Sequence, residues 1–164
     1  MRVRFVTLSL TTLALSASIA PAVTSAAPAA GDASSLSYFV GTWSCKTTKD
    51  PNPKMMGQVS TLTMTATKTW LKVKVPGGTV YVTRDVKLNK DAAVYLGDDG
   101  GYGLQRGPGW TGNTLTFTDI VNAGGDPLGV QTITKQSATA FHNTYAAKTP
   151  KGTIVSEMEC TKKS

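Results

Sequence analysis

Charged residues are scarce in this sequence: they make up 16% of the chain, and glutamate occurs only twice. This composition excludes an acidic disordered tail and a charge-rich helical rod. Few glutamates together with many threonines next to valine or leucine favour β-structure over helix. At 164 residues and 17.2 kDa, the chain has the size of one domain.

Metal-binding and nucleic-acid-binding patterns are also lacking. The single histidine and the two cysteines cannot complete a zinc-binding set, and there is no Cys-x-x-Cys motif. The lysines and arginines are scattered and form no concentrated basic patch. We therefore expect no metal, no cofactor and no nucleic-acid partner.

One uncharged apolar run occurs, at residues 5–20, between a basic start and an alanine-rich stretch at residues 21–30. This order is typical of a secretory signal peptide. A membrane anchor is the alternative, but about 20 apolar residues are needed to span a bilayer. We expect a signal peptide over residues 1–26, cleaved near Ala26 or Ala27 with Ala22 as a second choice. Its loss would lower the net charge from +7 to +5.

The chain after the signal peptide is expected to be exported to the periplasm or beyond, without a membrane span. It should begin with a flexible leader over residues 27–35, followed by one domain over residues 36–164. Cys45 and Cys160 lie near the two ends of this domain. Two cysteines in an exported chain predict one disulfide, which would bring the first and last elements side by side.

Helical periodicity is limited to residues 32–40, where Leu36, Phe39 and Val40 fall on one side and Gly41 ends the turn. The rest reads as short β-type runs separated by Gly, Pro, Asn and Asp. Ten strands are predicted, at residues 42–47, 57–67, 70–75, 79–88, 92–97, 101–106, 113–120, 128–135, 138–147 and 152–161.

Apolar and polar residues alternate along these runs, as in Leu71–Val73–Val75 against Lys72 and Lys74. One buried and one polar face per strand is typical of an antiparallel barrel or sandwich. Because the cysteines tie the ends together, we expect an all-β fold: a single up-and-down barrel of about ten strands with a short N-terminal helix. Such a barrel can hold side chains or one small ligand.

Two segments resemble a known family. Residues 39–45, with Gly41-Thr42-Trp43, resemble the Gly-x-Trp start of lipocalin-like (calycin) barrels. Residues 102–106 and 109–117 resemble a second landmark of small secreted bacterial proteins of unknown function that carry such a domain. The resemblance implies a barrel closed at one end by Trp43, and it implies no activity.

Four residues are candidates for binding a ligand in the barrel: Arg84, Tyr102, Arg106 and Phe117. Arg84 shares the phase of Val80 and Val82, where a charge needs a partner. It could anchor an anion, turn outward at a bulge, or pair with an acid such as Asp119. Arg106, in phase with Tyr102, is a second case.

His142 and Trp110 each have two interpretations. His142 could be a haem ligand, as a resemblance to nitrobindin-type barrels would imply, or an acid/base. However, Phe141 and Tyr145 are better core candidates, and this would place His142 outside. Trp110 follows Pro108-Gly109 in a predicted loop, where it could bind a partner or pack back onto the barrel.

No nucleophile with its base is evident, so we do not expect an enzyme. The favoured function is binding of a small apolar or amphipathic molecule in the lumen. One alternative is a protein-interaction or inhibitor barrel that acts through its loops, and the other is a haem protein that uses His142. An open apolar interior would favour the first, and a filled interior the second.

Overall fold

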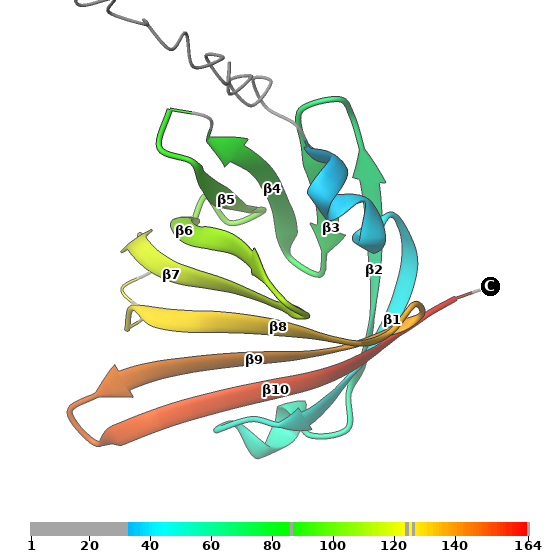
Figure 1. The fold of residues 1–164 in the computed structure, drawn as a ribbon. Coiled ribbons are helices and arrows are strands. Elements are labelled where there is room, and N and C mark those ends of the chain that lie inside the picture. The colour runs from blue at the N-terminus through cyan, green and yellow to red at the C-terminus, as the bar shows by residue number, and fades with distance from the viewer. Residues whose placement is uncertain (1–32, 86, 124, 126, 164) are drawn as a thin grey trace, which may run out of the picture.

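The computed structural model describes residues 33–85, 87–123, 125 and 127–163. The predicted signal peptide, with its cleavage site, lies outside these residues. Ten antiparallel strands form a closed barrel in which each strand pairs with its neighbours in the chain and β10 returns to β1 (Figure 1). The elements are η1 (Ala33–Phe39), β1 (Gly41–Lys49), η2 (Pro53–Met55), β2 (Val59–Ala66), β3 (Leu71–Val75), β4 (Gly78–Asp85), β5 (Lys90–Gly97), β6 (Tyr102–Thr111), β7 (Thr114–Asn122), β8 (Gly129–Ser137), β9 (Ala140–Thr149) and β10 (Gly152–Lys162).

The predicted fold class is confirmed, and so is the alternation that led to it. In β3, Leu71 and Val73 are buried while Lys72 and Lys74 are exposed. In β7, Leu115 and Phe117 are buried between less buried threonines. Period-two patterning therefore orients these strands with their apolar side chains toward the barrel interior.

The disulfide between Cys45 and Cys160 is confirmed. The two residues are direct register partners in the β1–β10 pair, with Cα atoms 4.0 Å apart. The bond spans 115 positions of sequence and lies where the barrel closes. Figure 1 shows β1 and β10 side by side at this closure.

Most strand boundaries differ from the prediction by one or two residues, and the fourth and sixth strands differ by more. The short helix is a 3₁₀ helix that includes residues 33–35, which were assigned to the leader. Val40 lies beyond its end and is exposed. The fourth strand ends at Asp85 and not at residue 88, because the Asp85 side chain accepts a hydrogen bond from the Leu88 backbone and Asn89 adopts a positive φ of 51°. These contacts form the turn into β5.

The largest difference concerns β6, which runs through Pro108 and Gly109 to Thr111, where a turn and loop had been predicted. The pairing with β7 shifts register between Arg106 and Gly109. Gly109 has a φ of +91°, a conformation that suits glycine. A bulge inside a strand thus accounts for the Pro-Gly pair, and the chain turns after Thr111 instead.

An aromatic cluster closes one end of the barrel. Trp43 is fully buried and donates its indole N–H to the Phe39 carbonyl oxygen at 2.7 Å. Phe39 packs against Phe141 and stacks on Trp110. Trp43 and η1 therefore both contribute to the closed end.

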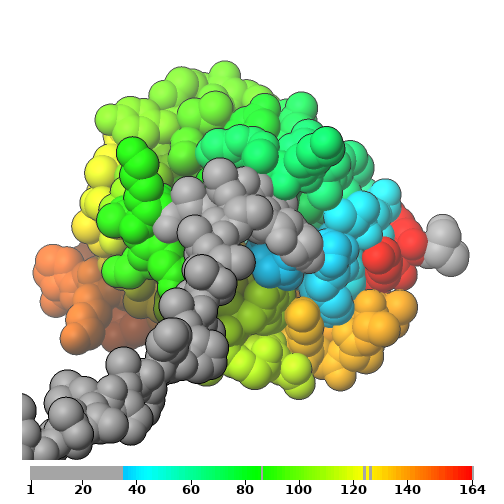
Figure 2. All heavy atoms as spheres, turned by 45° about the horizontal axis from the view of Figure 1, so that its top comes forward, coloured from blue at the N-terminus to red at the C-terminus, as the bar shows by residue number. Residues whose placement is uncertain are grey.

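The helix η1 is fixed to the strands at this end. The Tyr38 hydroxyl donates to backbone carbonyls of the β8–β9 turn, at 2.7 Å from Ala140 O, and burial raises the pKa of Tyr38. In the space-filling view, η1 and the start of β1 lie between the teal β2–β3 region and the orange β8–β9 turn (Figure 2). No helix in the described part of the chain is long and apolar enough to cross a membrane.

Candidate binding cavity

The barrel interior contains a cavity of about 660 Å³. Leu36 and Phe39 of η1 line it at the closed end. At the opposite end it is lined by residues next to the β3–β4, β7–β8 and β9–β10 turns, including Pro76, Pro127 and Ile154. The volume lies within the range of about 300–1,000 Å³ that is usual for small-molecule sites.

One side of the cavity is an apolar wall formed by strands β2 to β5. These strands are short, and most of their inward positions hold aliphatic or small side chains, with Tyr95 of β5 as the aromatic exception. The apolar wall consists of Leu62, Met64, Leu71, Val73, Val80, Val82 and Ala93. β-Branched and small residues occupy most of these positions, so the apolar wall contributes little side-chain volume to the lumen.

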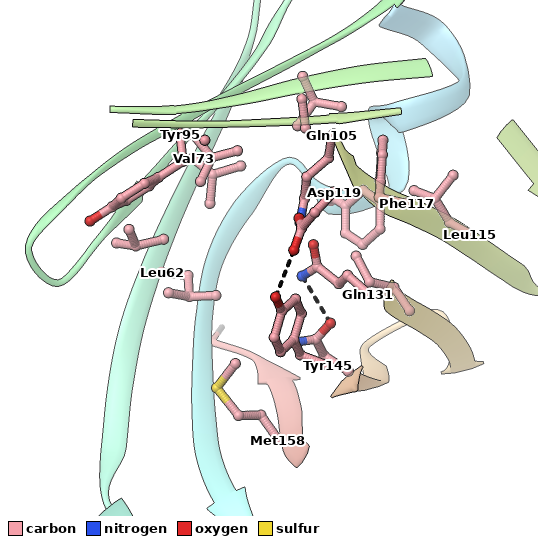
Figure 3. Close-up of a pocket in the computed structure, with 18 of the residues that line it drawn as sticks. Leu62, Val73, Tyr95, Gln105, Leu115, Phe117, Asp119, Gln131, Tyr145 and Met158 are labelled. Carbon is pink, nitrogen blue, oxygen red and sulfur yellow. Dashed lines mark hydrogen bonds between the residues drawn. The ribbon is translucent and has the colours of Figure 1, made fainter. Parts of the chain in front are cut away.

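The other side carries a row of polar side chains from strands β6 to β9, which we call the polar strip. Figure 3 shows four of its members together, across the lumen from Leu62 and Val73. The polar strip consists of Gln105, Asp119, Gln131, Asn143 and Tyr145.

Asp119 lies at the centre of the hydrogen bonds in the polar strip. Its Oδ1 accepts from Gln105 Nε2 at 2.8 Å, and its Oδ2 accepts from the Tyr145 hydroxyl at 2.6 Å and from the Gly129 backbone N–H at 2.8 Å. All three neighbours donate, so Asp119 acts as an acceptor. Gln131 Nε2 in turn donates to Asn143 Oδ1 at 3.0 Å.

Of the four predicted ligand-binding residues, only Phe117 lines the cavity. Tyr102 is 51% exposed and, like Arg106, is not among the lining residues, because Gly103 and Gln105 hold the inward positions of β6. The prediction followed the apolar phase of β6. The residues of that phase lie on the outer face of the barrel. There Tyr102 pairs with Leu96, which is about as exposed.

Arg84 is held by an ion pair outside the cavity lining. Its guanidinium donates to Asp91 Oδ1 at 2.9 Å and to the Asn89 side-chain oxygen at 2.7 Å. The expectation that Arg84 needs a partner is confirmed, but the partner suggested from the sequence, Asp119, is wrong. Asp91 falls between the strands predicted at residues 79–88 and 92–97. It lies opposite Arg84 in the β4–β5 register.

Asp91 is fully buried, and its second oxygen has no hydrogen-bond partner among the described residues. Burial raises the pKa of Asp91, while the hydrogen bond and charge of Arg84 act in the opposite direction. An acid in such surroundings can be retained because a cation is paired with it.

His142 lies on the outer face of β9, between Phe141 and Asn143, which point inward. Its Nδ1 is 2.7 Å from Glu159 Oε1, and its Nε2 is 2.9 Å from the Thr144 hydroxyl. The described residues contain no group of three or more His, Cys, Asp or Glu side chains suited to a metal ion. This placement gives no support to a haem ligand inside the barrel.

Trp110 packs inward at the closed end. Its indole N–H donates to Ser35 O at 2.9 Å, and Lys135 Nζ lies 3.7 Å from the centre of its ring. It is therefore part of the aromatic cluster and not a residue of a free loop.

The sequence contained part of the signal for the polar strip. Asp119 shares the phase of Leu115 and Phe117, and Tyr145 shares that of Phe141. No such signal pointed to Gln105, because in β6 the polar Gln105 faces inward while the apolar residues next to it face outward.

Scans against protein-family models and against curated proteins found no match for this chain.

Proposed function

We propose that this protein is an exported, non-enzymatic barrel that binds one small apolar or amphipathic molecule in its lumen. The observation that carries the proposal is the cavity of about 660 Å³ with its apolar wall. A filled interior would have favoured a protein-interaction barrel that acts through its loops. The disulfide at the closure is compatible with export, because such bonds persist in oxidising compartments.

Kinship with the small secreted bacterial proteins that carry lipocalin-like domains belongs to the same proposal. The Gly-x-Trp segment begins β1 directly after η1, as the resemblance implies. The closed end near Trp43 and the opposite end of the cavity also agree with a barrel that admits a ligand from one side.

The experiment is a titration of the purified, disulfide-bonded protein with N-phenylnaphthylamine, a neutral apolar probe whose fluorescence rises when it leaves water. We expect saturable binding at one site. Ala93→Phe, which places a ring in the cavity, should weaken binding by at least about tenfold. Ala92→Phe is the matched control, because Ala92 lies on the opposite face of β5.

Arg84→Ala supplies a second control. Since Arg84 does not line the cavity, its loss should leave the affinity of the folded protein for the probe unchanged. Absence of saturable binding to the wild-type protein would overturn the proposed function. Equal loss of affinity in both alanine-to-phenylalanine variants would show that the probe binds outside the lumen.

A further inference from the structure

The charge inside the cavity has one sign. Among the described residues that line it, Asp119 is the one charged side chain, and none is lysine, arginine or histidine. The cations nearest in sequence to the apolar wall, Lys72 and Lys74, alternate with inward residues and are exposed. The only arginine in phase with the interior of β4, Arg84, is paired with Asp91.

We propose that the cavity selects apolar molecules whose polar end donates hydrogen bonds and carries no negative charge, and that it rejects carboxylate-ended molecules such as fatty acids. This inference rests on the proposed binding in the lumen and adds the class of ligand. An Arg84 side chain that pointed into the cavity would instead have favoured ligands with an acidic end.

Asp119 is fixed as an acceptor before any ligand enters. A carboxylate offers about four acceptor positions, and Gln105, Tyr145 and Gly129 occupy three of them. These contacts come from three different strands or their ends, so the carboxylate is held in place. Its remaining capacity can be satisfied by a donor on the ligand.

The two glutamines of the polar strip present further acceptors. Gln105 and Gln131 each use Nε2 to donate to another member of the strip, and the described residues provide no partner for either Oε1 atom. A hydroxyl or ammonium group on the ligand would therefore meet several oxygen atoms that are already oriented.

A carboxylate on the ligand would meet the opposite situation. It would lose hydration and face the negative charge of Asp119 without a compensating cation, and like charges in a confined site repel strongly. Asn143 offers a neutral amide donor, but a neutral donor does not balance a second negative charge.

The test compares three ligands with the same alkyl chain, namely decanol, decylammonium and decanoate, as competitors for bound N-phenylnaphthylamine near neutral pH. We expect decanol and decylammonium to displace the probe, and decanoate to bind at least about tenfold more weakly than decanol. Asp119→Asn should reduce this gap to about threefold or less.

Glu159→Gln is the matched control, because it removes one negative charge on the outer face and should leave the gap as it is in the wild type. Decanoate that binds as tightly as decanol to the wild-type protein would overturn this inference alone. Failure of the probe and of all three competitors to bind would overturn the proposed function and the inference with it. Because the decisive comparison uses the wild-type protein, it does not depend on how well Asp119→Asn folds.

Discussion

At the scale of single residues, the ion pair between Arg84 and Asp91 shows how this barrel tolerates a buried acid. Asp91 is fully buried, and the Arg84 side chain is 26% exposed. The guanidinium can therefore remain partly hydrated while it compensates the carboxylate. Removing either partner would leave the other in an unfavourable environment.

The raised pKa of Asp91 predicts a specific dependence of stability on pH. The folded protein holds the Asp91 proton more tightly than the unfolded chain, so this residue's contribution to stability is fully present below its ordinary pKa of 3.8 and is lost as pH rises through the folded value. In urea denaturation, we expect Asp91→Asn to be more stable relative to wild type near pH 7 than near pH 4.

The control for this comparison is Asp99→Asn, an exposed acid in the β5–β6 turn. The opposite trend in Asp91→Asn would contradict the raised pKa and would show that the pair with Arg84 outweighs the cost of burial.

The sequence predicted that Arg84 needs a partner but not that Asp91 is that partner. The phase of Arg84 with Val80 and Val82 required a partner, and the register of one hairpin determines which acid that is. Register depends on the turn at residues 87–89, which could not be read from alternation alone.

At the scale of elements, β6 is the strand in which sequence and structure differ most. Its bulge places two glycines against neighbouring groups. A Cβ atom at Gly107 would overlap the Thr116 carbonyl of β7, and one at Gly109 would lie 2.7 Å from the Arg84 guanidinium. Pro108 between them cannot donate to the β-ladder, which is tolerated at a bulge.

This geometry predicts that Gly107→Ala destabilises the protein by more than about 2 kcal/mol, because the backbone of β6 or β7 must move to admit a methyl group. Gly103→Ala is the matched control on the same strand. Its added Cβ would make ordinary contacts at 3.5 Å or more, and its φ is not positive. Urea denaturation of both variants measures the difference, and similar losses at the two positions would contradict the packing described for the bulge.

Strand positions were predictable from alternation and turn residues, whereas the bulge was not. Pro-Gly is typical of turns, and only the pairing of β6 with β7 reveals that this pair lies within a strand. The same strand hid Gln105, because its apolar neighbours in β6 point outward, so errors in both the fold and the candidate site fall on β6.

At the scale of the whole molecule, barrel closure was predictable and the cavity was not. Two cysteines near the ends of the domain pointed to the β1–β10 contact before any strand was placed. Whether a lumen is filled depends on side-chain volumes summed around the barrel. Here Ala93 and Gly103 contribute little volume at inward positions, and Phe39, Trp43, Trp110 and Phe141 pack together at the closed end.

The disulfide lies at the pair of strands that closes this lumen, so the final prediction concerns its removal. Closing a loop between positions 115 apart removes freedom from the unfolded chain, a stabilisation of about 4–5 kcal/mol in the chain-entropy model. We expect Cys45→Ala combined with Cys160→Ala to lower the free energy of unfolding by about that amount or more, because two buried side chains are also shortened. The β1–β10 pairing, which runs from Trp43–Lys162 to Lys49–Glu157, should still form under native conditions, since paired residues flank the cysteines on both sides.

Urea denaturation of the double variant, of the oxidised wild type and of the wild type reduced with dithiothreitol measures the free energy of unfolding of each form. The reduced wild type separates the loss of the cross-link from the loss of packing. A reduced wild type as stable as the oxidised form would show that barrel closure depends on strand pairing alone.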